Sequence, residues 1–442
     1  MNARTFQTLS RILSFVFGIG AAFGQPHTAL APDALDAQLQ SAVLDKHHVG
    51  FSLYDMDQQH FVYGKNQDHH FTPASNTKVF TLFSALTVLG DSIPGLAYIE
   101  TPDSLIFWGT GDPSFLHPEL DNGRVFQFLK ATDKTLYYAP AKTQEPVYRA
   151  GWAIDDYDYS YQPEISDFPI YGNLARFHSQ EGKLISIPTH FQQSISMTLA
   201  DTTDTYRIRR EIDRNVFHIR PSAAPQSYRT KKPFRTADTL VAKLLTDTLH
   251  KKVHIVDKEP PENPQILYSI PTRQVLREMM LPSDNFIAEQ LHMLAAFTKY
   301  RSFQTSDLRE FMQEIYDQTL TDTIQLRDGS GLSSYNKITP RSMVELLLMI
   351  ADRIPDPAQR HYLFPAGGLE GTLKNVYPTP GGQVFVWAKT GTIHSVHCQS
   401  GYLISKAGNR YAFSFLNNNF FGSATPVREE MVRVITYIYE NF

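Results

Sequence analysis

The chain has 442 residues, of which 42% are hydrophobic and 19% are charged. This composition is typical of a globular protein with a large core and is too apolar for a disordered chain. The formal net charge is −4, whereas nucleic-acid-binding proteins carry a basic excess. Cys398 is the single cysteine, which excludes an internal disulfide bond and a cysteine-based zinc cluster. We therefore expect neither a nucleic-acid-binding protein nor a disulfide-stabilised scaffold.

The first 24 residues are typical of a secretory signal peptide. Arg4 and Arg11 provide a positive start, and residues 12–23 are almost wholly apolar. This stretch is shorter than the roughly 20 apolar residues that a membrane span needs. Ala22 and Gly24 place small residues at the two positions that signal peptidase recognises. We expect a signal peptide over 1–24, a periplasmic or otherwise exported protein and no stable membrane span; an uncleaved N-terminal anchor is the alternative.

The sequence after the signal peptide, up to Gly90, predicts a helix, a β-hairpin and a second helix. Apolar residues recur at helical spacing over 33–47, and two alternating runs, 49–55 and 60–64, indicate a β-hairpin. Pro73 suits the first turn of a helix that Gly90 ends. From about 95 to 265, short strand-like runs such as 104–108 and 135–138 alternate with turn residues, which indicates a β-rich region with one or two helices.

The last part of the chain predicts helices followed by strands. The helical segments are 271–300, interrupted at Leu281-Pro282, then 306–319 and 340–352; the strands are 383–389, 396–405 and 411–416, before a final helix from about 426. The early hairpin and the late strands are typical of one sheet that the middle region divides. We expect an α/β (α+β) fold in which an antiparallel sheet is flanked by helices, with one domain formed by 25–94 and 266–442 and a β-rich insertion over 95–265.

Three short motifs stand out in chain order. Ser75-Asn76-Thr77-Lys78 opens the helix after the hairpin, Ser283-Asp284-Asn285 lies at the break between helical runs, and Lys389-Thr390-Gly391 ends a strand. Residues three apart on a helix share a face, so Lys78 can reach the Ser75 hydroxyl. A buried ammonium beside a second cation, here Lys389, loses affinity for its proton and can act as a base.

Each motif alone is a weak signal, since a chain of this length contains about two Ser-x-x-Lys matches by chance. Ser334-Tyr335-Asn336-Lys337 is such a match, but it lies in a Gly-Ser-rich loop with no apolar run behind it. The order and context of the three motifs, helix start, helix junction and strand end, favour Ser75.

Together the three motifs resemble those of the penicillin-recognising serine enzymes. The longer runs 283–291, 328–333 and 388–392, with 109–113, 151–156 and 368–373, are similar to the D-alanyl-D-alanine carboxypeptidase/endopeptidase family, peptidase family S13. The resemblance implies a serine β-lactamase/transpeptidase-like fold. It also implies a penicillin-binding, serine-type carboxypeptidase that acts on peptidoglycan stem peptides and cross-links, with β-lactams as covalent inhibitors. The resemblance implies no metal or other cofactor.

The resemblance also implies residue roles. Ser75 is then the acylated nucleophile, Lys78 its general base and Ser283 a proton relay to the leaving amine. Asn285 positions the substrate amide. Lys389 and Thr390 bind the terminal carboxylate of the substrate, Gly391 allows its backbone to approach closely, and the Thr392 N–H forms an oxyanion hole with that of Ser75.

Asp156, with Tyr161, is implied to hold the ammonium of a diaminopimelate-type side chain. The family pattern adds an Arg and a Gln to this subsite, where the present chain has Ser334 and His394. The sequence therefore leaves the residue accepted before D-alanine open. His394-x-x-His397-Cys398 is not expected to bind metal, because a strand would turn the two histidines to opposite faces.

Two alternatives to a carboxypeptidase use the same scaffold. A β-lactamase or esterase shares the serine and lysine, but usually lacks a long insertion after the first motif. A catalytically inactive wall-peptide-binding protein needs none of the catalytic side chains, and the intact Ser75, Lys78 and Lys389 argue against it.

Overall fold

The computed structural model describes residues 32–442 except 144, 198–205, 220–222 and 379–380. The signal peptide predicted over 1–24 lies outside the described residues. Within them, no helix is long and apolar enough to cross a membrane.

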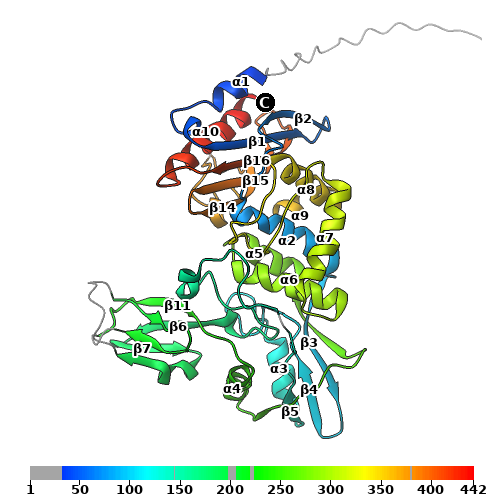
Figure 1. Ribbon diagram of the computed structural model, residues 1–442, viewed down its shortest axis with the longest axis vertical. Helices are drawn as coiled ribbons and strands as arrows, with labels where there is room; N and C mark the ends of the chain where they lie inside the picture. Colours follow the sequence, from blue (N-terminus) through cyan, green and yellow to red (C-terminus); the bar gives the residue numbers. More distant parts are fainter. Residues whose placement is uncertain (1–31, 144, 198–205, 220–222, 379–380) are drawn as a thin grey trace, which may run out of the picture.

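A five-stranded antiparallel sheet brings together the early hairpin and the late strands, as predicted (Figure 1). Its strand order is β14-β15-β16-β1-β2. The strands are β1 (His48–Asp55), β2 (His60–Lys65), β14 (Val386–Ile393), β15 (Val396–Ile404) and β16 (Arg410–Asn418). Because β16 pairs with both β15 and β1, residues more than 300 positions apart become neighbours in the core.

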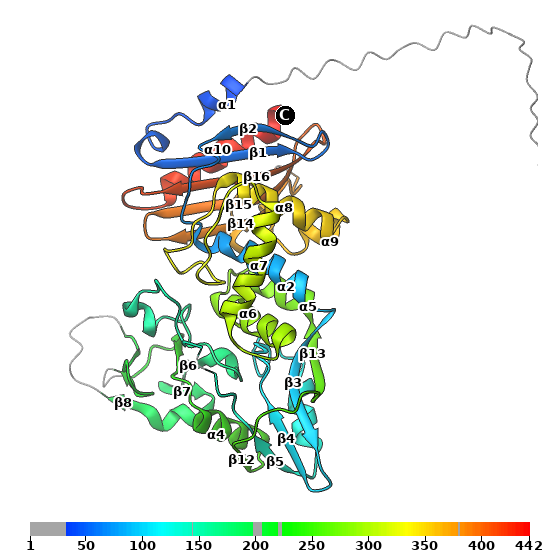
Figure 2. The same cartoon turned by 45° about the vertical axis from the view of Figure 1, so that its right-hand side comes forward.

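Helices cover both faces of this sheet (Figures 1 and 2). The alternation of side chains along β16 shows how: Phe413 and Phe415 pack on the side of α1 (Pro32–Gln38) and α10 (Thr425–Asn441). Ala412 and Leu416 face the opposite side, toward α2 (Thr77–Val88) and α8 (Pro340–Arg353). Every residue of β16 after Arg410 is buried, since both faces are covered.

The remaining helices form the body below the sheet. They are α5 (Thr272–Met280), α6 (Asn285–Tyr300), α7 (Thr305–Thr319) and α9 (Pro357–His361). The predicted interruption at Leu281-Pro282 is confirmed, because α5 ends before it and α6 begins after it. Residues 285–297 of α6 are all buried, so this helix is central to the core.

The middle of the chain forms a second five-stranded sheet and a lobe of two small sheets. The second sheet has the order β12-β5-β4-β3-β13, and the lobe contains β11-β6-β7 and β8-β10-β9. The elements are β3 (Ser92–Glu100), β4 (Ser104–Trp108), α3 (Arg124–Ala131), β5 (Thr135–Tyr138), β6 (Leu174–Gln180), β7 (Lys183–Ile187), β8 (Ile195–Met197), β9 (Arg209–Arg210), β10 (Phe217–Ile219), β11 (Arg229–Pro233), α4 (Asp238–Leu249), β12 (Val253–Ile255) and β13 (Gln265–Pro271). The predicted strands 104–108 and 135–138 coincide with β4 and β5; the domain boundaries near 95 and 265 stay a prediction.

Three local predictions were wrong. The helix expected over 33–47 ends at Gln38, because the Ser41 hydroxyl accepts the backbone N–H groups of residues 43 and 44 and starts a separate 3-10 turn. Strand β14 starts at Val386 rather than 383 and continues to Ile393, so Lys389-Thr390-Gly391 lies inside the strand. His394 lies in the turn before β15, not in a strand.

Candidate active site

Ser75 lies in a short 3-10 turn, η2 (Ala74–Asn76), that leads directly into α2. Two glycines allow the backbone on either side to approach this turn closely. A Cβ atom on Gly331 would lie 1.9 Å from the Ala74 carbonyl oxygen, and one on Gly391 would lie 2.7 Å from the Ser75 nitrogen. The turn is thus held between β14 and the loop around residue 331, while Ser75 itself stays partly exposed.

Lys78 reaches Ser75 as the three-residue spacing predicts. Its Nζ donates to Ser75 Oγ at 3.0 Å, to Asn285 Oδ1 at 2.6 Å and to the Ser330 carbonyl oxygen at 2.6 Å. The side chain is fully buried. All three donor positions of the amine are therefore used, and its orientation toward the hydroxyl is fixed.

Burial lowers the pKa of Lys78 to about 8, although Asp328, Asp284 and Glu289 act in the opposite direction. Burial also lowers the pKa of Lys389 well below its ordinary value, and the charge of Lys78 lowers it further. Burial is the main cause for both lysines, and the repulsion expected from a second cation adds to it for Lys389.

Ser283 and Asn285 come from the break between α5 and α6. Ser283 has a φ of 64°, and Asp284 caps α6 by accepting the Ile287 N–H at 2.9 Å. Ser283 Oγ accepts a hydrogen bond from Lys389 Nζ at 2.7 Å, so its direct lysine partner is Lys389. Asn285 uses both ends of its amide, since Nδ2 donates to the Tyr161 carbonyl oxygen at 3.0 Å.

The residues of β14 line the other side of the site. Lys389 Nζ also donates to the Thr390 carbonyl oxygen at 2.5 Å, and Thr390 Oγ1 donates to Thr372 Oγ1 at 2.7 Å. Thr392 Oγ1 lies 2.7 Å from Nδ1 of His397. Burial lowers the pKa of His397 to about 4, so this imidazole is neutral at neutral pH.

Sequence reasoning missed a buried network behind Lys78. Glu289 Oε1 accepts the backbone N–H groups of Gly329 at 2.9 Å and Ser330 at 2.8 Å, while Oε2 accepts from Arg149 Nε at 3.1 Å. Arg149 also pairs with Glu145. Glu289 is fully buried, and it fixes the loop whose carbonyl oxygen binds Lys78. The runs 283–291 and 328–333 contain Glu289 and its backbone partners, but their sequences do not show that the two runs are in contact.

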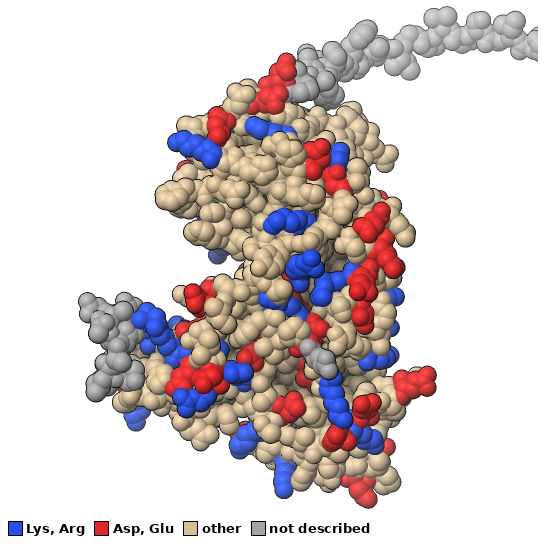
Figure 3. Space-filling view, viewed as in Figure 1, with Lys and Arg blue, Asp and Glu red and all other residues tan. Residues whose placement is uncertain are grey.

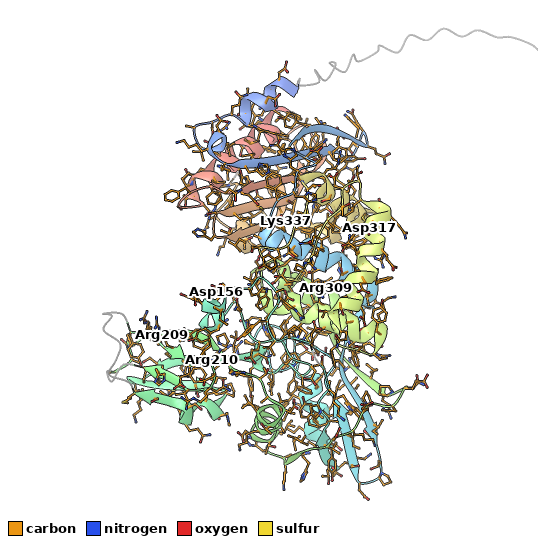
Figure 4. The ribbon with its side chains drawn as sticks, viewed as in Figure 1. Asp156, Arg209, Arg210, Arg309, Asp317 and Lys337 are labelled. Carbon is orange, nitrogen blue, oxygen red and sulfur yellow. The ribbon has the colours of Figure 1, made fainter. Side chains whose placement is uncertain are left out.

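Asp156 lies apart from this cluster, in the 3-10 turn η3 (Ile154–Asp158). In Figure 4 it lies on the side of the lobe that faces the first sheet, and Figure 3 shows the surface hollowed between these two parts. Burial and a hydrogen bond to Asp156 raise the pKa of Tyr161. Since the Tyr161 carbonyl oxygen binds Asn285, Asp156 is linked to the site through this segment.

Lys337 belongs to the second Ser-x-x-Lys match and makes different contacts. Its Nζ donates to the carbonyl oxygen of Ser334 at 2.6 Å, and to Thr72 Oγ1 at 2.9 Å. The hydroxyl-to-amine bond of Ser75 and Lys78 therefore distinguishes the two matches.

Comparisons with known proteins identify the family and the fold of the chain. Residues 31–437 match the D-Ala-D-Ala carboxypeptidase 3 (S13) family. The D-alanyl-D-alanine carboxypeptidase DacB of Haemophilus influenzae is 25% identical over 426 residues, which cover 84% of this chain and 85% of the relative. The D-alanyl-D-alanine carboxypeptidase of Actinomadura sp. R39 is 24% identical, with 93% and 85% covered.

Solved structures share the fold. The crystal structure of penicillin-binding protein 4 (dacB) from Haemophilus influenzae superposes with a TM-score of 0.72 at 20% sequence identity, covering 93% of this chain and all of that one. Bd3459, a predatory peptidoglycan endopeptidase from Bdellovibrio bacteriovorus, superposes with a TM-score of 0.52 at 15% identity, covering 89% and 92%. The serine β-lactamase/transpeptidase-like fold expected above is confirmed, and the chain belongs to the D-Ala-D-Ala carboxypeptidase 3 (S13) family of serine-type carboxypeptidases.

Proposed function

We propose that this chain cleaves the D-Ala-D-Ala end of peptidoglycan stem peptides, and peptide cross-links, through an acyl-enzyme on Ser75. The observation that carries the proposal is the Ser75–Lys78 hydrogen bond of 3.0 Å, with Lys78 fully buried and its pKa lowered to about 8. A lysine with this pKa has a sizeable neutral fraction at physiological pH and is a competent general base.

In the proposed acylation, Ser75 Oγ attacks the carbonyl carbon of the penultimate D-alanine while Lys78 takes the hydroxyl proton. The backbone N–H groups of Ser75 and Thr392 bind the oxyanion, where loss of one donor typically raises the barrier by about 2.7–4 kcal/mol. The C–N bond then breaks, and Ser283 relays to the leaving amine the proton that Lys78 took, which leaves Lys78 neutral again. Water hydrolyses the ester, with Lys78 again accepting a proton.

The substrate carboxylate has a second role in this scheme. Lys389 and Thr390 bind it, and Asn285 positions the substrate amide. A carboxylate beside Lys389 favours the charged form of that lysine, and a charged Lys389 in turn disfavours charge on Lys78. Substrate binding thus moves the proton toward Lys389 and leaves Lys78 ready to act as the base.

Several features of the proposal come from the sequence and the relatives. Segment 1–24 supports export to the periplasm or cell surface. A structure of the Haemophilus influenzae protein in complex with a β-lactam supports β-lactams as inhibitors. Asp156 and Tyr161 support a positively charged group on the substrate residue before D-alanine, because Asp156 is a carboxylate at the edge of the site.

Intact-protein mass spectrometry after incubation with benzylpenicillin tests the mechanism. We expect a long-lived adduct on the wild type and on Ser334→Ala, which alters the second Ser-x-x-Lys match, but none on Ser75→Ala. D-alanine release from a pentapeptide should then follow the same pattern. A transient adduct with rapid penicillin hydrolysis would instead indicate a β-lactamase, and no adduct on any protein would leave a wall-peptide-binding protein.

A further inference from the structure

A pocket of about 420 Å³ lies beside the Thr390 end of the site. It is enclosed by the 3-10 turn η6 (Gly371–Leu373), residues 374–378 and the first turns of α10. Thr372 lines the pocket, and its hydroxyl accepts the hydrogen bond from Thr390 Oγ1 at 2.7 Å. The pocket therefore begins directly beside Thr390, the proposed carboxylate-binding residue of β14.

Positively charged residues outnumber negatively charged ones in the lining of this pocket. Lys374 and Arg428 line it together with a single carboxylate, Glu429. Both cations are exposed, and neither side chain forms an ion pair or hydrogen bond with a residue that the structure describes. Arg428 projects from the start of α10, and Lys374 follows the turn η6, so the two cations come from different elements of the pocket wall.

The place of the pocket decides which part of a substrate can reach it. With the scissile carbonyl at Ser75 and the carboxylate of the leaving residue at Thr390, the pocket lies next to that leaving residue, and the leaving peptide of a cross-link continues from its side chain. A free D-alanine ends there and does not enter the pocket. The leaving peptide of a cross-link does extend, and stem peptides carry further carboxylates.

We propose that this pocket is a subsite for a carboxylate on the leaving peptide of a cross-linked substrate, bound by Lys374 and Arg428. The inference rests on the proposed function and deepens it, because it gives endopeptidase cleavage its own contacts. Release of D-alanine from an uncross-linked peptide uses none of them.

The test compares two substrates, a cross-linked muropeptide dimer and a monomeric pentapeptide that ends in D-Ala-D-Ala. In the double variant Lys374→Ala/Arg428→Ala, we expect the ratio of kcat/KM for the dimer to that for the monomer to fall about tenfold, as the loss of two partly exposed charge contacts allows. The matched variant Arg124→Ala/Lys406→Ala removes two exposed cations elsewhere, and it should keep the ratio within about twofold.

Binding provides a readout that does not depend on turnover. In the Ser75→Ala background, the two pocket substitutions should weaken binding of the dimer, measured by calorimetry, by a similar factor. Amidation of the dimer's free carboxylates should remove the difference in affinity between the proteins with and without these substitutions. An unchanged ratio, an equal fall in the matched variant, or a wild type that cleaves the monomer but not the dimer would overturn the subsite. Absence of both acylation and D-alanine release would instead overturn the proposed function, and the subsite with it.

Discussion

The Lys78 side chain makes acylation depend on pH. Its pKa is lowered from 10.5 to about 8 by burial, so the neutral fraction at pH 7 is about a tenth rather than well below a thousandth. Because the neutral amine is the base, the second-order rate of acylation by benzylpenicillin should rise with pH and level off above about 8. Stopped-flow measurements of the acylation rate between pH 5.5 and 9.5 follow this rise, which we call the acylation limb. A rate that is flat across that range would contradict the assignment of Lys78 as the base.

Glu289 should affect both this pH profile and the stability of the fold. Its negative charge raises the pKa of Lys78, so Glu289→Gln should move the acylation limb to lower pH. The same change leaves the buried Arg149 with one carboxylate fewer, which should cost about 3 kcal/mol of unfolding free energy.

Glu145 provides the matched control for that substitution. It also pairs with Arg149, but the backbone N–H groups of residues 329 and 330 bind Glu289 and not Glu145. Glu145→Gln should therefore destabilise the protein in urea unfolding while leaving the acylation limb in place. If both variants moved the limb equally, the effect would come from the loss of an ion pair with Arg149 rather than from the charge of Glu289 on Lys78.

At the scale of elements, the contact between β14 and η2 fixes the position of Ser75, the proposed nucleophile. A Cβ atom on Gly391 would lie 2.7 Å from both the Pro73 carbonyl oxygen and the Ser75 nitrogen, closer than real contacts allow. Gly391→Ala should therefore push the strand and the turn apart and slow acylation by about a hundredfold. Gly90→Ala is the control, since nothing lies within 4 Å of its Cβ position, and its acylation rate should match the wild type.

Elements with strong local patterns could be predicted from the sequence, and the contacts between them could not. The alternation of apolar and polar residues predicted β1 and β2, and the three-residue spacing on a helix predicted that Lys78 lies beside Ser75. The hydrogen bond of Asn285 to the Tyr161 carbonyl oxygen joins residues 124 positions apart, and every residue type carries such a carbonyl group. Ser283 is predicted to relay a proton to the leaving amine, and its hydrogen bond with Lys389 joins two separate motifs, a contact that the spacing within either motif does not reveal.

At the scale of the whole molecule, the chain builds one site from segments that lie far apart in the sequence. The Ser330 carbonyl oxygen and Lys78 are 252 positions apart, and Arg149 connects the middle region to α6 through Glu289. The middle region thus contributes contacts to the site, although all three catalytic motifs lie outside it. Within the middle region, Arg210 connects the lobe of small sheets to the segment that carries Asp156.

Arg210 attaches the segment that carries Asp156 to the lobe. Its buried guanidinium donates to the Tyr157 carbonyl oxygen at 3.2 Å, and its backbone N–H donates to Asp158 Oδ1 at 2.8 Å. Lys232 of β11 holds the same Asp158 at 2.5 Å. The orientation of η3 therefore depends on the lobe, whereas Lys78 bonds directly to Ser75, Asn285 and Ser330, none of which belongs to the lobe.

Arg210→Met should consequently separate two activities. We expect KM for peptides with a diaminopimelate-type side chain to rise about tenfold, because Asp156 is no longer held in place, while benzylpenicillin, which lacks that side chain, acylates Ser75 at the wild-type rate. Arg209→Met is the matched control, since Arg209 is the exposed neighbour of Arg210 on the same strand (Figure 4). Equal losses toward peptide and penicillin would show that the lobe supports the whole site rather than its side-chain specificity.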